Sequence, residues 1–176
     1  MAGQSSRTSP TVAVLMGGIS AEREVSLSSG KACASALRDQ GYKVVEVDAG
    51  PSLVQCLQSI DPYAVLNCLH GRWGEDGCVQ GILEWVGIPY SHSGVLSSAL
   101  AMDKQRSKNI YRSVKLPVVD SIIVPAIAAR EKHLMKPPYV VKPNNEGSSV
   151  GVYVVHENSS GPPQLGLDMP ELVMVE

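Results

Sequence analysis

The sequence predicts an α/β protein in which a parallel-sheet domain is followed by a second, smaller α+β domain. Short apolar runs alternate with helical patterns in the first half of the chain, which is typical of βαβ units and a mostly parallel sheet. These runs are apolar throughout, as expected for strands that are covered on both faces. After about Ser93 the regular alternation stops, and helices are followed by closely spaced strands.

Four strands and three connecting helices are expected in the first domain. The strands are residues 11–16, 42–48, 64–69 and a short run at 88–91. The first helix should end at Gly41, because glycine favours the left-handed conformation that follows a helix. The apolar face of that helix is predicted to consist of Val25, Ala32, Cys33, Ala36 and Leu37. The second helix, with its apolar positions between 53 and 60, ends before Pro62, and the third, around 79–86, is stopped by Gly87.

A helical stretch is expected at 93–114, across the boundary to the second domain. Its inward residues are predicted to be Leu96, Leu100, Ile110 and Val114. Strands are then expected at 117–125, 137–143, 150–155 and 171–176, with a weak helix at 126–135 and a loop at 156–170.

The predicted domain boundaries follow from these patterns. Residues 1–10 are small and polar and are expected to be disordered. The first domain is predicted to span residues 11–96 and the second 97–176. Because the sequence stops inside an apolar strand, we expect an unfinished sheet with an open edge, and a truncated chain or part of a longer protein.

Composition excludes several classes of protein. The net charge of −2 and the pI of about 6.1 argue against electrostatic binding to nucleic acid or to an anionic membrane. No apolar run is long enough to span a bilayer, and the N-terminus lacks the apolar core of a signal peptide, so we expect a cytoplasmic protein. The four cysteines occur singly, without a CxxC pair, as in a reducing compartment.

Three loops carry the candidate functional residues: 17–24, 70–77 and 145–151. The first two follow strands of the parallel sheet, so both should lie at its carboxyl edge, where open sheets bind ligands. Neither G-x-G-x-x-G nor the P-loop pattern occurs in the sequence.

Each candidate in the first two loops has a structural alternative. Glu22, expected in the first turn of a helix, either complements the helix dipole or holds a substrate ammonium group. His70, between a strand end and a glycine, is either structural or close to a ligand. Asp76 is favoured as a helix N-cap.

The third loop lies between two strands, in the stretch "KPNNEGSSVGVY". It is either an ordinary hairpin turn or a lid over an anionic ligand. Its backbone N–H groups and the hydroxyls of Ser148 and Ser149 could surround phosphate oxygens, with Lys142 adding a positive charge. Lys104 is a second candidate for phosphate, although a lysine on a helix usually lies on a solvated face.

Taken together, "VLMGGISAEREVSLSSG", "LHGRWGEDG" and "YVVKPNNEGSSVGV" resemble the D-alanine–D-alanine ligase family of ATP-grasp enzymes. The resemblance runs from about Val12 to Glu176. It implies a Rossmann-like, pre-ATP-grasp N-terminal domain followed by an incomplete ATP-grasp central domain, with the C-terminal catalytic domain absent from this sequence. It also implies ATP-dependent synthesis of the D-alanyl-D-alanine dipeptide through an acylphosphate, for peptidoglycan, by a homodimer that associates through its N-terminal domain.

The resemblance also implies roles for residues of the first domain and the lid. Glu22 would bind the ammonium group of the first D-alanine, and His70 would lie near the carboxyl end of that substrate. Ser148 would connect the lid to Glu22 through a hydrogen bond.

The nucleotide residues are implied by the same resemblance. Lys104 and Lys142 would contact the phosphates of ATP, and Glu176 would begin the adenine hinge. The remaining members of the nucleotide-covering loop would be Glu146, Gly147 and Ser149.

The sequence departs from the family where the metal ions should bind. The acids after Gly151 are Glu157, Asp168, Glu171 and Glu176, and none forms the family's E-x-N pattern. Ligands for Mg²⁺ or Mn²⁺ are therefore expected in a part that this sequence lacks, and the chain alone is expected to be inactive. Two alternatives remain: another ATP-grasp carboxylate–amine ligase, such as a D-alanine–D-lactate type, or a non-catalytic fragment that self-associates.

Overall fold

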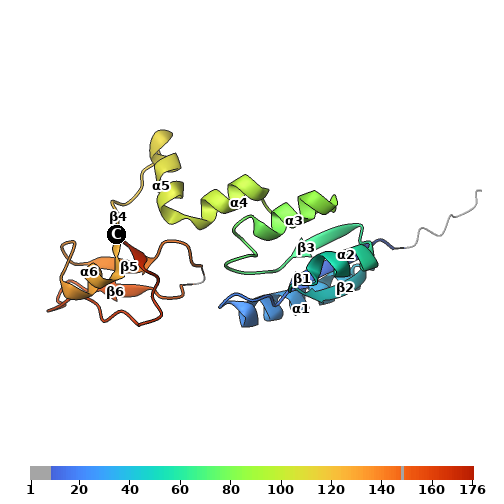
Figure 1. The fold of residues 1–176 in the computed structure, drawn as a ribbon, viewed down its shortest axis with the longest axis horizontal. Coiled ribbons are helices and arrows are strands. Elements are labelled where there is room, and N and C mark those ends of the chain that lie inside the picture. Colours follow the sequence, from blue (N-terminus) through green and yellow to red (C-terminus); the bar gives the residue numbers. More distant parts are fainter. Residues whose placement is uncertain (1–8, 148) are drawn as a thin grey trace, which may run out of the picture. The chain divides into compact units, whose positions relative to one another are not determined.

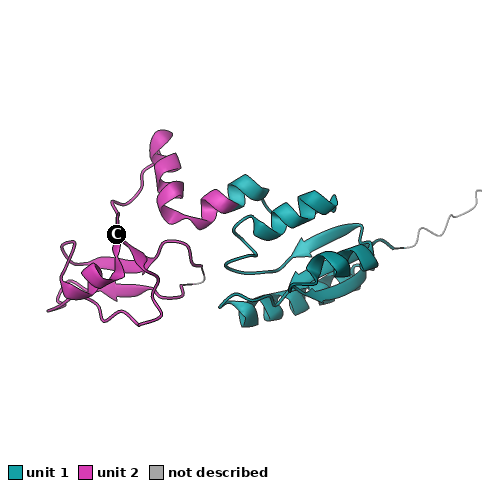
Figure 2. Cartoon of the chain, viewed as in Figure 1, with its two compact units in different colours: residues 1–98 teal, residues 99–176 magenta. Residues whose placement is uncertain are grey.

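The computed structural model describes residues 9–147 and 149–176. Residues 1–8, within the predicted disordered start, and Ser148 lie outside this description. The chain divides into two compact units, Met1–Ser98 and Ala99–Glu176 (Figure 2).

The first unit is a βαβ structure with a parallel sheet in the order β2-β1-β3 (Figure 1). Its elements are β1 (Thr11–Met16), α1 (Arg23–Asp39), β2 (Lys43–Asp48), α2 (Leu53–Ile60), β3 (Ala64–Asn67), α3 (Cys78–Val86) and the start of α4 (Val95–Met102). The predicted parallel βαβ arrangement is therefore confirmed. Strand β3 is two residues shorter than predicted, since it ends at Asn67.

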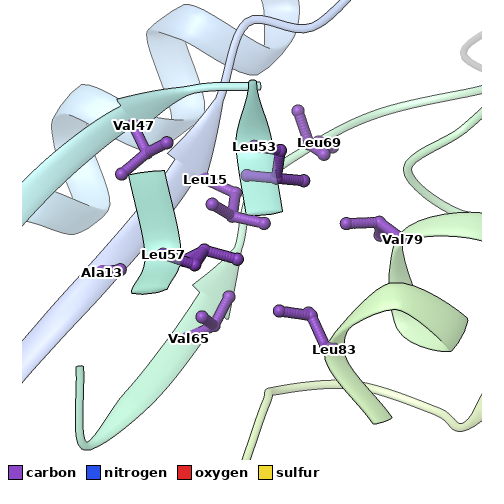
Figure 3. Packing of buried hydrophobic residues seen from close by; sticks show 9 residues of the cluster. All are labelled: Ala13, Leu15, Val47, Leu53, Leu57, Val65, Leu69, Val79 and Leu83. Carbon is purple, nitrogen blue, oxygen red and sulfur yellow. The ribbon is translucent and has the colours of Figure 1, made fainter. Parts of the chain in front are cut away.

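Helices cover both faces of this sheet, which explains why its central strand is apolar throughout. On one face, Leu57 of α2 and Leu83 of α3 pack with Leu15 of β1, and all three side chains are fully buried (Figure 3). On the other face, Val14 and Met16 pack against α1.

The buried face of α1 was predicted only in part. Cys33 and Leu37 pack against the apolar cluster on this face of the sheet, as predicted. Val25 is exposed, and the buried positions are the small residues Ser26, Gly30 and Ala34. The helix approaches the sheet so closely that a Cβ atom on Gly30 would lie 2.4 Å from the Cβ of Met16. Close contact here requires small side chains, which a search for large apolar residues does not select.

The predicted fourth strand at 88–91 reduces to one isolated bridge. Tyr90 forms a parallel bridge with Val65, but no strand continues from it. His92 has a φ of 80°, so the backbone turns immediately after the bridge.

The second unit contains an antiparallel sheet in the order β4-β7-β5-β6. Its elements are α5 (Lys104–Ser113), β4 (Ile122–Pro125), α6 (Ala126–Glu131), β5 (Tyr139–Pro143), β6 (Tyr153–Val155) and β7 (Leu172–Val175). The last strand lies inside this sheet, between β4 and β5, and the two outer strands are β4 and β6. Tyr139 and Val141 of β5 pack toward α6 in one apolar cluster, and strand alternation therefore points Lys142 to the opposite face.

The stretch at 93–114 is largely helical, as predicted, but the prediction of its inward residues was wrong. It is broken at Asp103, whose carboxylate accepts the N–H of Arg106 at 2.9 Å and caps a new helix, α5. Because the periodicity does not continue across this break, Leu96 and Val114 are exposed and the buried residue of α4 is Ser98. No helix in the described residues combines the length and apolar composition that a membrane span requires.

Candidate functional site

The loops that follow β1 and β3 meet at the carboxyl edge of the parallel sheet. The Ser20 hydroxyl donates to the carbonyl oxygen of His70 at 2.8 Å and also accepts the backbone N–H of Glu22 at 3.2 Å. Loops that are 50 residues apart in sequence are thereby tied together. The prediction that both loops lie at this edge is confirmed.

Glu22 is a buried residue at the start of α1. It is only 2% exposed, and neither carboxylate oxygen has a hydrogen-bond partner among the described residues. The structure places it at the N-cap of α1, one residue before the predicted first turn, and its side chain makes no capping bond. Buried carboxyl groups are costly without a donor or counter-charge, so this arrangement favours a cationic ligand that donates hydrogen bonds.

Gly71 is the residue that lets the second loop approach this carboxyl group. Its φ is +67°, and a Cβ atom at this position would lie 2.6 Å from the Glu22 Oε1 atom. The backbone N–H of Gly71 donates to Glu75 Oε2 at 2.6 Å, which holds the turn in place.

His70 directly precedes Gly71, and its imidazole ring has a defined orientation. Its Nδ1 atom is 3.0 Å from the carbonyl oxygen of Cys68, which also accepts the Ser26 hydroxyl at 2.7 Å. A carbonyl oxygen can only accept, so this contact requires the proton on Nδ1 and leaves the Nε2 lone pair free in the neutral ring. His70 lines a cavity of about 220 Å³ next to the loop at 17–20.

The prediction that Asp76 is a helix N-cap is wrong, and its carboxylate instead stabilises the loop. The N-cap of α3 is Gly77, and Asp76 accepts the N–H groups of Trp73 at 2.9 Å and Cys78 at 3.1 Å. Burial would raise the pKa of Asp76, but these two N–H groups outweigh it and hold that pKa below its usual value.

In the second unit, the N-terminus of α5 holds the start of the predicted lid. The carbonyl oxygen of Asn144 accepts the backbone N–H of Lys104 at 3.1 Å, and its side-chain oxygen accepts that of Gln105 at 3.0 Å. The Lys104 ammonium group donates to the carbonyl oxygens of Asn144, at 3.3 Å, and of Glu146. Lys104 is therefore half-buried against the loop, not on a solvated helix face, and burial together with the charge of Lys142 lowers its pKa.

A second lysine of α5 joins this cluster. Lys108 and Lys142 each donate to a different carboxylate oxygen of Glu176. Burial would raise the pKa of Glu176, but the hydrogen bonds from the two lysines hold it below its usual value. Sequence reasoning missed Lys108, although its spacing of four residues from Lys104 places both on one helix face.

Two cavities flank these lysines. The smaller, about 210 Å³, is lined by Lys104, Lys142 and the loop residues Glu146, Gly147 and Ser149. The larger, about 480 Å³, is lined by the face of α5 with Lys142 and Glu176. The structure thus brings together all the predicted nucleotide residues that it describes. Ser148 lies outside the described residues, and its hydrogen bond to Glu22 stays a prediction.

Magnesium or manganese has no fitting site in the part of the chain that the structure describes. That part contains no group of three or more His, Cys, Asp or Glu side chains placed to hold a metal ion. Glu176, the acid beside Lys108 and Lys142, already has a lysine on each oxygen.

A parallel βαβ unit followed by a unit with an antiparallel sheet is the fold class of the ATP-grasp proteins to which the chain is similar. The solved structures of D-alanine–D-alanine ligase from Bacillus anthracis have this fold. One of them has 33% sequence identity to the chain and a TM-score of 0.73, and the match covers 96% of this chain and 57% of the Bacillus anthracis chain. Another, described as complexed with ATP, shares 30% at a TM-score of 0.71, over 96% and 58%.

Sequence relatives agree with the structural ones. D-alanine–D-alanine ligase from Roseobacter denitrificans is 71% identical over 174 residues, covering 99% of this chain and 54% of that protein. The ligase of the same name from Ruegeria sp. is 66% identical over 174 residues, covering 99% and 57%. No family model matches the chain. The chain spans about half the length of these curated relatives, and in the part that it spans its sequence and fold are those of the D-alanine–D-alanine ligase family.

Proposed function

We propose that the chain is the part of a D-alanine–D-alanine ligase that binds the first D-alanine in one unit and the phosphates of ATP in the other. In the proposed reaction, the carboxylate of one D-alanine attacks the γ-phosphorus of ATP, giving an acylphosphate and ADP. The amine of a second D-alanine attacks the acyl carbon and expels phosphate, which leaves the dipeptide for peptidoglycan in the cytoplasm. The names of the relatives and the ATP complex of one structural neighbour support this proposal.

The observation that carries the proposal is the buried Glu22 carboxyl group, whose two oxygens have no partner among the described residues. An amino-acid ammonium group supplies both the positive charge and the N–H donors that such a group lacks. His70, with its free Nε2 atom, lies on the adjoining loop and would orient the substrate.

The charge of the second unit supports phosphate binding. Lys104 and Lys142 line one cavity together with the small-residue loop, and Lys108 lies beside Lys142 on Glu176. Ammonium groups beside such a loop suit a polyphosphate, and the backbone N–H groups of the loop would add donors.

The chain alone is not expected to transfer the phosphoryl group, because the described residues do not fit a divalent metal. Their proposed roles are to bind and orient the substrates. We expect the chain to release no phosphate in the presence of ATP and D-alanine, which a phosphate-release assay measures. We further propose that it self-associates through the first unit, which sedimentation velocity tests.

A pair of glutamates in neighbouring positions tests the substrate site. Glu22→Gln removes the carboxylate that would bind ammonium, while Glu24→Gln makes the same change at an exposed position of α1. A charged hydrogen bond contributes roughly 1.5–3 kcal/mol, so we expect D-alanine binding to weaken about tenfold or more in the first variant only. Binding is followed by NMR titration with D-alanine, and L-alanine serves as the control ligand. Equal affinity in the two variants would refute the proposed site.

A further inference from the structure

Glu176 holds two lysines that differ in their other contacts. Lys108 also donates to the carbonyl oxygen of Val119 at 3.1 Å, and its side chain is 12% exposed. Lys142 has Glu176 as its one hydrogen-bond acceptor among the described residues, and its side chain is 22% exposed. Lys142 is therefore the less firmly held of the two.

Lys142 lines both cavities, whereas Lys108 lines the larger cavity and not the smaller one. In the structure its ammonium group is bound to Glu176, on the side of the larger cavity. A phosphate in the smaller cavity, beside Gly147 and Ser149, would attract the same ammonium group. Glu176 and the phosphate are thus competing acceptors for Lys142.

Loss of Lys142 would leave the Glu176 carboxylate, which is 14% exposed, in need of another partner. Lys108 is already bonded to the second oxygen of that carboxylate and anchored on Val119. A half-buried carboxylate that keeps one ammonium partner avoids most of the cost of an unpaired buried charge.

We propose that Lys108 is a positioning residue of the phosphate site: it retains Glu176 and so frees Lys142 to move from Glu176 to the bound phosphate. This inference rests on the proposed function, because it assumes that the smaller cavity binds a polyphosphate. Lys108 touches no phosphate in this scheme and acts through Glu176 alone.

A double-mutant cycle tests the inference with inorganic tripolyphosphate as the ligand, titrated by calorimetry into the chain and its variants. Glu176→Gln replaces the competing carboxylate by a neutral amide, a weaker acceptor for an ammonium group, and should tighten binding about tenfold, equivalent to about 1.4 kcal/mol. Lys108→Met leaves Lys142 as the sole partner of Glu176 and should weaken binding about tenfold. In the Glu176→Gln background, Lys108→Met should change the affinity for tripolyphosphate by no more than about threefold, because Lys108 then has no carboxylate to pair with at position 176.

Lys132→Met is the matched control, since it removes one exposed lysine of the same unit. If Lys108→Met weakens binding equally in both backgrounds, Lys108 acts only as a positive charge and the inference is wrong. If the unaltered chain does not bind tripolyphosphate, the proposed phosphate site itself fails, and the two failures are thereby distinguished.

A measurement on the unaltered chain covers the case in which a variant does not fold. The ¹⁵Nζ resonances of the lysines are followed by NMR as tripolyphosphate is added. We expect the resonance of Lys142 to shift at saturation and that of Lys108 to stay at its starting position. A shift of Lys108 equal to that of Lys142 would overturn the inference.

Discussion

Replacing Gly71 by alanine should damage the substrate site through a single atom. The residue has a φ of +67°, where an L side chain costs roughly 1–2 kcal/mol. The new Cβ atom would also lie 2.6 Å from Glu22 Oε1, closer than the 3.0 Å below which an atom must shift. The carboxyl group would therefore be displaced by several tenths of an ångström from the position in which we expect it to bind ammonium.

Gly41→Ala separates the two effects. Gly41 has a φ of +85°, and a Cβ atom there would have no heavy atom within 4 Å. Both variants should lose about 1–2 kcal/mol in the free energy of unfolding from the backbone alone, measured by urea denaturation. We expect D-alanine binding to weaken about tenfold or more in Gly71→Ala and to be unchanged in Gly41→Ala, since positioning errors near a bound group are costly. Equal D-alanine affinities in the two variants would show that the contact with Glu22 is irrelevant.

Three further predictions concern stability. Asp103→Ala removes the cap of α5 and should cost about 1 kcal/mol in urea denaturation, whereas no loss would mean that the cap is unimportant. The hydrogen bond from Arg23 lowers the pKa of Asp48. The Asp48 carboxylate therefore stabilises the fold at pH values above its unfolded pKa of about 3.9. This stabilisation is lost as the pH falls through the lower pKa of the folded state. Asp48→Asn should thus be less stable than the unaltered chain at neutral pH but equally stable in strong acid, and a constant difference across pH would contradict this. On α3, Leu83→Ala should cost about 2–5 kcal/mol and Trp85→Ser, at a side chain that is 91% exposed, less than about 0.5 kcal/mol; similar losses would invalidate the packing argument.

The parts of the fold that follow from backbone periodicity were predictable. The apolar run that became β1 could be recognised because buried parallel strands need apolar residues on both faces. The positions of Glu22 and His70 at one sheet edge followed from the rule that parallel strands end on the same side. The sequence could not show that the Glu22 carboxylate has no hydrogen-bond partner among residues 9–147 and 149–176, because this depends on the packing of distant loops.

The errors have a common physical origin in small and polar residues. Gly30 and Ser26 lie in the buried face of α1 because the helix approaches the sheet closely, yet neither contributes to an apolar pattern. Asp103 interrupts a continuous apolar periodicity with a cap. Lys108 belongs to a charged helix segment whose burial depends on Glu176, and the two residues are 68 positions apart in the sequence.

The position of β7 inside its sheet has a consequence for synthesis on the ribosome. Ile122 pairs with Val175, and Val141 pairs with the same residue from the other side. Strand β5 can pair with β6 as soon as both have been synthesised, but β4 has no partner until β7 has left the exit tunnel and is inserted between β4 and β5. Until then β4 is unpaired and the other edge of β5 is open, and such edges are prone to aggregate. The first unit can complete its sheet from β1, β2 and β3 much earlier.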